Sequence, residues 1–123
     1  MNTPHILVVD DNVAAADGLV RLLKALGQPA QAVYAPEDAL EYEDRKHVAL
    51  AFVDIGMPDM DGFELIGRMR QDGFGAPAYS LSGYGQEEDR LRAREAGFTD
   101  HLTKPIGAAE LREVLSIQSI KLS

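Results

Sequence analysis

The chain has 123 residues, no cysteine and a formal net charge of −8, and 46% of its residues are hydrophobic. This length suits a single domain over residues 1–123 with a hydrophobic core, and the absence of cysteine excludes disulfides, thiolate metal sites and cysteine nucleophiles. The acidic balance argues against direct binding to nucleic acid or to an anionic membrane, and without a membrane span or a signal peptide we expect a cytoplasmic domain.

Short apolar runs alternate with segments of helical periodicity along the chain. The first run, residues 6–9, has no polar interruption, which is typical of a strand buried on both faces. Apolar residues then recur at helical spacing as far as Leu26, and Gly27 is a suitable helix end. We next expect a weaker strand over residues 31–34, a helix from Pro36 to about Arg45, and a strongly apolar strand over residues 48–53.

The alternation continues in the second half of the chain. We expect a helix that starts near Met60, a strand over 78–81, a charged helix over about 84–96, a short strand over 100–102 and a last helix over about 107–118. Five strands alternating with five helices predict a parallel sheet covered on both faces. Because crossovers are right-handed, we expect a doubly wound α/β sheet, the flavodoxin-like (βα)5 fold with strand order 2-1-3-4-5.

Polar residues follow the predicted strands at their carboxyl ends, where such sheets bind ligands. Asp10 and Asp11 follow the first strand, Asp54 the third, Ser82 the fourth and Lys104 the fifth. Three carboxylates gathered there would repel one another without a cation, and an all-oxygen site favours a hard ion such as Mg²⁺. Lys104 and Ser82 suit phosphate oxygens, so we expect a phosphoryl site with Asp54 as the acceptor.

Four segments, in order, resemble the receiver domains of response regulators, of the CheY-like kind. They are residues 6–12, 54–62, 81–83 and 102–105. The resemblance covers nearly the whole chain, and its later part is similar to receivers attached to hybrid histidine kinases. It implies a switch of a two-component system or phosphorelay. A sensor histidine kinase or a histidine phosphotransfer protein would donate the phosphoryl group, and the chain would catalyse only its own phosphorylation and dephosphorylation.

The resemblance also implies a set of metal ligands. Asp11 and Asp54 would bind Mg²⁺ directly, with Mn²⁺ as an alternative ion. Asp10 would act through a coordinated water, and the backbone carbonyl of Gly56 would complete the protein ligands.

The resemblance implies that two further residues contact the phosphoryl group. Ser82 would be the switch hydroxyl that moves to the phosphoryl group, and Lys104 would form an ion pair with that group. The peptide bond between Lys104 and Pro105 would be cis. The family often carries Tyr or Phe three residues before the lysine, where this chain has His101. An imidazole can still rotate between buried and exposed positions, although it offers less packing area and can change its charge near neutral pH.

The resemblance also implies two positions that tune dephosphorylation, two residues after the acceptor and two after the switch hydroxyl, and in this chain they are Gly56 and Tyr84. Neither can orient a water through a carboxylate or an amide, so we expect a long-lived phosphorylated state. The charged helix, the last strand and the last helix would form the output face for a downstream protein or a homodimer, with Tyr84, Arg90 and Arg94 as candidates. We expect Leu91 and a few alanines to anchor this helix weakly.

Other interpretations are open at this point. A pseudo-receiver would keep the fold without phosphorylation, although such modules usually lose one of the five polar positions. A Mg²⁺-dependent phosphohydrolase also forms an aspartyl phosphate, but 123 residues leave no room for its cap. Taken singly, Asp10 and Asp11 could cap a helix and Asp54 a turn, and their joint placement favours the site. We expect His5 and His47 at the surface without a role.

Overall fold

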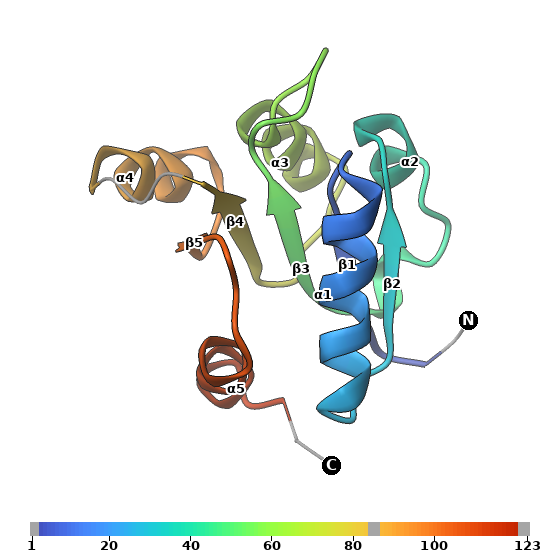
Figure 1. Ribbon diagram of the computed structural model, residues 1–123. Coiled ribbons are helices and arrows are strands. Elements are labelled where there is room, and N and C mark those ends of the chain that lie inside the picture. Colours follow the sequence, from blue (N-terminus) through green and yellow to red (C-terminus); the bar gives the residue numbers. More distant parts are fainter. Residues whose placement is uncertain (1–2, 84–86, 121–123) are drawn as a thin grey trace.

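Five parallel strands form one sheet in a computed structural model that describes residues 3–83 and 87–120, without the side chains of residues 87–89 (Figure 1). The strands are β1 (His5–Val9), β2 (Ala30–Val33), β3 (Val48–Asp54), β4 (Ala78–Ser82) and β5 (Asp100–Thr103). Their order is β2-β1-β3-β4-β5, which confirms the predicted flavodoxin-like doubly wound fold. The helices are α1 (Val13–Ala25), α2 (Pro36–Leu40), α3 (Gly62–Gln71), α4 (Glu87–Ala96) and α5 (Ala108–Ile117), with a 3-10 helix, η1, over Arg45–His47.

Helices cover both faces of the sheet. Alternate side chains of β1 pack in opposite directions: Ile6 and Val8 lie with α1 and α5, whereas Leu7 and Val9 lie with α2, α3 and α4. All five residues of β1 are consequently buried, as expected of a central strand in a parallel sheet. In the described part of the chain, no helix is long and apolar enough to cross a membrane.

Side-chain caps begin the two helices that follow the acidic strand ends. Asn12 accepts a hydrogen bond from the backbone N–H of Ala15 (3.0 Å) at the start of α1, and Asp61 accepts one from Glu64 (2.9 Å) at the start of α3. Gly27, with φ of 84°, closes α1 as predicted. These caps fix the two loops on either side of the carboxyl edge of the central strands.

Arg70 ties the end of α3 to the end of α4. Its Nε and Nη2 atoms donate to the carbonyl of Gly97 (3.1 and 3.0 Å), which directly follows α4. Its Nη1 atom donates to the carbonyls of Phe74 (2.9 Å) and Ala76 (2.6 Å) in the loop before β4. One guanidinium group therefore joins the carboxyl ends of two helices to the loop between β4 and α3.

Two helix boundaries differ from the prediction. Helix α2 ends at Leu40 rather than near Arg45. Just beyond this end, the Tyr42 hydroxyl lies 2.6 Å from Nε2 of His5 in β1. Helix α3 begins at Gly62 rather than near Met60, because Asp61 supplies the cap. A polar side-chain contact lies next to each of these two helix boundaries, between distant residues for α2 and within the chain segment for α3.

Two predictions of surface exposure were wrong. His5 is only 2% exposed, because its ring nitrogens bond to the carbonyl of Thr3 (2.8 Å) and to Tyr42. Leu91, expected together with a few alanines to anchor α4, is 53% exposed, whereas Ala93 is buried as that prediction expects. His47, also expected at the surface, is partly buried and lies 2.6 Å from a carboxylate oxygen of Asp44.

Gly62 offers a test of how tightly α3 joins the end of β3. A Cβ at this position would lie 2.7 Å from the carbonyl oxygen of Asp54 and 2.8 Å from Cα of Ile55. We expect Gly62→Ala to lower the free energy of unfolding by about 1–3 kcal/mol, because backbone atoms must shift. Gly67→Ala in the same helix meets no atom within 4 Å and should stabilise by about 0.5–1 kcal/mol. Urea unfolding measures both, and equal effects would contradict the close contact.

Candidate functional site

Three carboxylates meet at the carboxyl edge of the sheet. Asp10 and Asp11 follow β1, Asp54 ends β3, and one oxygen of each lies within 4.8 Å of the others. Asp10 is 2% exposed and Asp54 is 8% exposed, whereas Asp11 is exposed to solvent. The predicted cluster is therefore present, with two buried members and one that faces the outside.

The surroundings of Asp54 make the ionised form of its carboxyl group unfavourable. Burial raises the pKa of its carboxyl group above the ordinary 3.8, and the charge of Asp10 raises it further. The backbone N–H of Gly56, which donates to Oδ1 at 3.3 Å, and the charge of Lys104 oppose this rise in pKa. The remaining excess of negative charge is what a bound cation would relieve.

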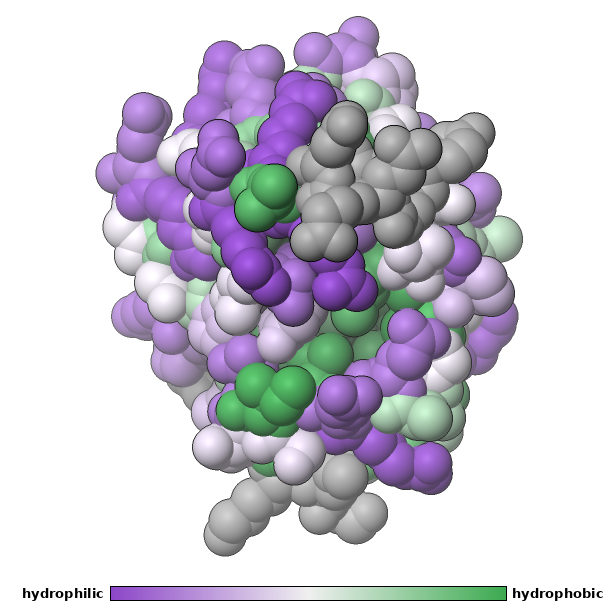
Figure 2. Space-filling model, turned by 90° about the vertical axis from the view of Figure 1, so that its left-hand side faces the viewer, coloured by the Kyte–Doolittle hydropathy of each residue, from purple (hydrophilic) through white to green (hydrophobic). Residues whose placement is uncertain are grey.

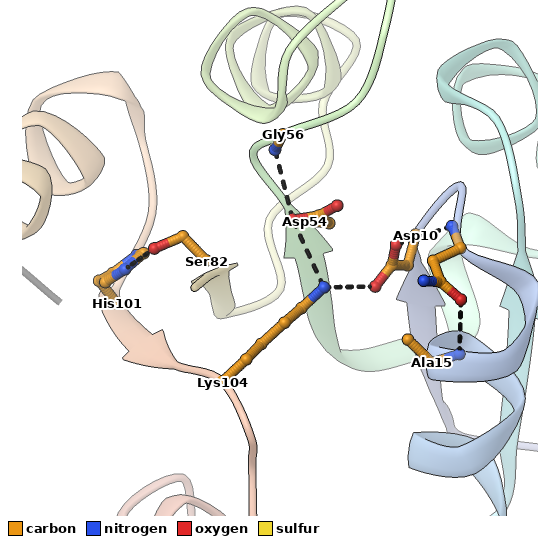
Figure 3. Close-up of polar contacts among 8 residues, drawn as sticks. Asp10, Ala15, Asp54, Gly56, Ser82, His101 and Lys104 are labelled. Carbon is orange, nitrogen blue, oxygen red and sulfur yellow. Dashed lines mark hydrogen bonds and ion pairs between the residues drawn. The ribbon is translucent and has the colours of Figure 1, made fainter. Parts of the chain in front are cut away.

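Lys104 projects its ammonium group between two of the carboxylates (Figure 3). Nζ lies 2.9 Å from Oδ2 of Asp10 and 3.7 Å from Oδ1 of Asp54. Burial alone would lower the pKa of Lys104, but the hydrogen bond and charge of Asp10, together with Asp54, raise it above 10.5. Its backbone N–H donates to the carbonyl of Ser82 (2.7 Å), and the Lys104–Pro105 bond is cis, as the resemblance implies.

Ser82 lies at this edge of the sheet, but its hydroxyl points toward His101 rather than toward Asp54 (Figure 3). The distance from Oγ to Nε2 of His101 is 2.9 Å, and the other ring nitrogen lies 2.5 Å from Oγ of Ser80. Ser80 is not among the predicted site residues. Its only signal is a second serine two residues before Ser82, on the same side of β4.

The donor atoms present suit a hard divalent cation. Each of the three carboxylates offers one oxygen to a common centre, and Lys104 neutralises part of the remaining charge. Position 56 leaves space beside Asp54, because a Cβ there would meet only the Asp54 carboxylate oxygens, at 3.8 and 4.0 Å. The carbonyl of Gly56 stays a predicted ligand.

An apolar groove of about 500 Å³ adjoins the site. It lies between α1 and the loop after β5, with Leu19 and Leu22 on one side and Pro105 and Ile106 on the other. Asp10 and Lys104 form the end of the groove nearest the carboxylates. A partner seated there would have direct access to the acidic cluster.

The predicted output face consists of α4, β5 and α5. Figure 2 views this side of the molecule, where hydrophilic side chains surround a few apolar patches. Arg90 and Arg94 are exposed on α4, and Arg94 lies 3.5 Å from a carboxylate oxygen of Asp100. Tyr84 lies outside the described residues, so its predicted roles stay predictions.

The raised pKa of Asp54 makes a prediction about stability and pH. A carboxyl group whose pKa is raised by folding stabilises the native state below the unfolded pKa, and this contribution is lost as pH rises through the folded pKa. We therefore expect Asp54→Asn to be more stable than the wild-type protein at pH 7 without divalent cations, and the difference to shrink toward pH 4. Urea midpoints measured across this range, with EDTA present, provide the test. A wild-type protein more stable than Asp54→Asn at pH 7 would contradict it.

Comparisons with known proteins agree with this arrangement. The sequence model of a protein family, the response regulator receiver domain, matches residues 6–116. An uncharacterized 14.6 kDa protein in the sodA1 3′ region of Leptolyngbya boryana is 43% identical over 108 residues, which cover 86% of this chain and 82% of that protein. The sensor histidine kinase RcsC of Escherichia coli strain K12 is 30% identical over 112 residues, or 91% of this chain and 12% of RcsC.

Solved structures give the same answer. The receiver domain of NtrX from Brucella abortus matches with a TM-score of 0.82 and 28% identity, covering 92% of this chain and 96% of that one. The match of the family model extends over most of the chain, and the relatives at 30% identity or more cover over four fifths of it. The chain belongs to the family of response regulator receiver domains.

Proposed function

We propose that this domain is a phosphoacceptor switch that takes a phosphoryl group from a phosphohistidine onto Asp54. The observation that supports this most directly is the placement of Lys104 between the buried carboxylates of Asp10 and Asp54. A site that collects acceptor, cation ligands and a fixed ammonium group has the parts that phosphoryl transfer requires.

The chemical step is an in-line displacement at phosphorus. A carboxylate oxygen of Asp54 attacks the phosphorus atom, and the bond from phosphorus to the donor imidazole nitrogen breaks. The electron pair stays on that nitrogen, which takes up a proton, and an acyl phosphate forms on Asp54. Lys104, already beside Asp54, places positive charge where the phosphoryl oxygens arrive.

Mg²⁺ fits the proposal as the cofactor, with Mn²⁺ as an alternative. Asp11 and Asp54 would hold the ion directly, Asp10 through a water, and the carbonyl of Gly56 would complete the protein ligands. Bound there, the ion supplies charge neutralisation between the carboxylates and the incoming phosphoryl oxygens.

The phosphoryl group would then change the surface of the domain. It adds a charge of about −2, which attracts Lys104 and the Ser82 hydroxyl. The Ser82 hydroxyl, which lies beside His101, must direct its hydrogen to the phosphoryl group, and the segment between β4 and α4 follows Ser82 in the chain. The exposed side chains of α4, together with β5 and α5, are the face that we propose for a downstream protein or a second copy.

A histidine kinase or a histidine phosphotransfer protein is the donor that we propose. The groove beside Asp10 and Lys104 gives such a partner an apolar surface to bind next to Asp54. The similarity to RcsC, a sensor histidine kinase, agrees with a receiver that works alone or within a larger kinase. We propose a cytoplasmic location and a single domain over residues 1–123 on the same basis.

Acetyl phosphate and beryllofluoride test the acceptor. With Mg²⁺ we expect one phosphoryl group per wild-type chain by intact mass, and no label in Asp54→Asn or with EDTA present. Absence of label would favour a pseudo-receiver, and many turnovers of acetyl phosphate without a stable adduct would favour a phosphohydrolase. Beryllofluoride with Mg²⁺ should likewise shift NMR signals of the wild-type protein and leave those of Asp54→Asn unchanged. The dispersed NMR spectrum of Asp54→Asn checks that this variant is still folded.

The lifetime of the phosphorylated form gives a second test. We expect slow loss of phosphate, because glycine at position 56 cannot orient an attacking water. Gly56→Asn should accelerate this loss by about ten-fold or more, since a positioned polar group is provided. Gly56→Ala is the matched control, because it makes the same backbone change without the amide. Rapid loss of phosphate from the wild-type protein would contradict the prediction.

A further inference from the structure

A buried row of three polar side chains runs beside the proposed acceptor. The His101 ring lies between Ser80 and Ser82, with Nδ1 2.5 Å from Oγ of Ser80 and Nε2 2.9 Å from Oγ of Ser82 (Figure 3 shows the second contact). His101 is 1% exposed and Ser80 is fully buried. A polar row of this kind inside an otherwise apolar layer must be satisfied internally.

The sheet register explains how one ring reaches both hydroxyls. Ser80 pairs with His101 across β4 and β5, and Ser82 is the next residue of β4 on the same face. Val53, the β3 partner of Ser80, belongs to the apolar cluster that contains Ala93 of α4. The ring therefore lies in the layer between the sheet and the helices α3 and α4.

The tautomer of the His101 ring determines which group donates in each of these two hydrogen bonds. A neutral ring has one nitrogen that donates and one that accepts, whereas a serine hydroxyl can do either. If Ser82 donates to Nε2, its single hydrogen is engaged by the ring. If Nε2–H donates to Ser82 instead, the hydroxyl hydrogen of Ser82 is available for another acceptor, and Nδ1 then accepts from Ser80.

Phosphoryl oxygens only accept hydrogen bonds, so a phosphoryl group on Asp54 favours the second order. We propose that Ser80 and His101 are positioning residues that orient the switch hydroxyl by this row of hydrogen bonds. In the phosphorylated form Ser80 donates to Nδ1, Nε2–H donates to Ser82, and Ser82 donates to the phosphoryl group. This inference rests on the proposed role of Asp54.

The ring stays buried in this mechanism. Rotation of His101 to the surface would break two buried hydrogen bonds and remove the imidazole partner of Ser80 from a fully buried position. The coupling between Ser82 and α4 thus passes through a fixed polar ring, and does not need a side chain that exchanges between inside and outside.

NMR of ¹⁵N-labelled histidine gives a direct readout. The wild-type protein is compared with and without beryllofluoride and Mg²⁺, and the His101 signals are assigned as those missing in His101→Phe. We expect the adduct to carry its hydrogen on Nε2, with Nδ1 accepting and with slow solvent exchange. A hydrogen on Nδ1 in the adduct, or a ring open to solvent, would overturn the proposal.

Kinetics of labelling by acetyl phosphate give the second readout. We expect Ser80→Ala and His101→Phe each to slow labelling by about five-fold, the usual effect of one lost hydrogen bond, and the double variant to slow it no further. Ser80→Thr keeps the hydroxyl and should label at the wild-type rate. Wild-type labelling by His101→Phe would show that an aromatic ring suffices and would overturn the proposal.

The controls separate this inference from the proposed function. If the wild-type protein is not labelled, the acceptor role of Asp54 fails and the inference falls with it. If the wild-type protein is labelled, Asp54→Asn is not, and the Ser80 and His101 variants label normally, the inference alone fails. Urea unfolding of each variant shows whether a slower rate reflects loss of folded protein.

Discussion

The carboxylates of Asp10, Asp11 and Asp54 lie close together at one edge of the sheet, and positive charge must offset their mutual repulsion. Asp10 is almost wholly buried, so its charge would be costly without the ammonium group of Lys104 at 2.9 Å. This ion pair joins β1 to the segment after β5, although the two strands are not neighbours in the sheet. Electrostatic attraction therefore links strands that the backbone hydrogen bonds leave apart.

Asp54 combines a structural disadvantage with a chemical use. Burial and the charge of Asp10 make its anion unfavourable, while Gly56 and Lys104 recover only part of that loss. A carboxylate in this position gains from any event that brings positive charge close to it, such as the binding of a cation. The charges at this edge of the sheet therefore favour a state in which a cation lies among the carboxylates.

The sequence was sufficient to predict the sheet and the residues at its carboxyl edge. Uninterrupted apolar runs identify strands covered on both faces, and the rules of parallel sheets then place Asp10, Asp54 and Lys104 together. The end of α2, the burial of His5 and the exposure of Leu91 were not predictable in this way. The first two depend on the contact of His5 with Tyr42, which joins distant segments and leaves no periodic signal. The exposure of Leu91 reflects which face of α4 packs inward, and that face carries Ala93.

The partner of His101 was missed for a related reason. Serine is common on surfaces, and the sequence alone does not show that position 80 is fully buried opposite a histidine. Strand register decides this, because it sets Ser80 directly across from His101 while Ser82 follows on the same face. The placement of the candidate site residues was therefore easier to predict than the hydrogen bonds that orient them.

The bonds from Arg70 to the carbonyl of Gly97 restrict how α4 can respond to an event at the acceptor. They hold the carboxyl end of the helix, whereas its amino end follows the segment after Ser82. A rotation of α4 about its Gly97 end would leave these hydrogen bonds in place. If α4 moves in the switch that we propose, its first turns, where Arg90 lies, would move farther than its last turn, where Arg94 lies.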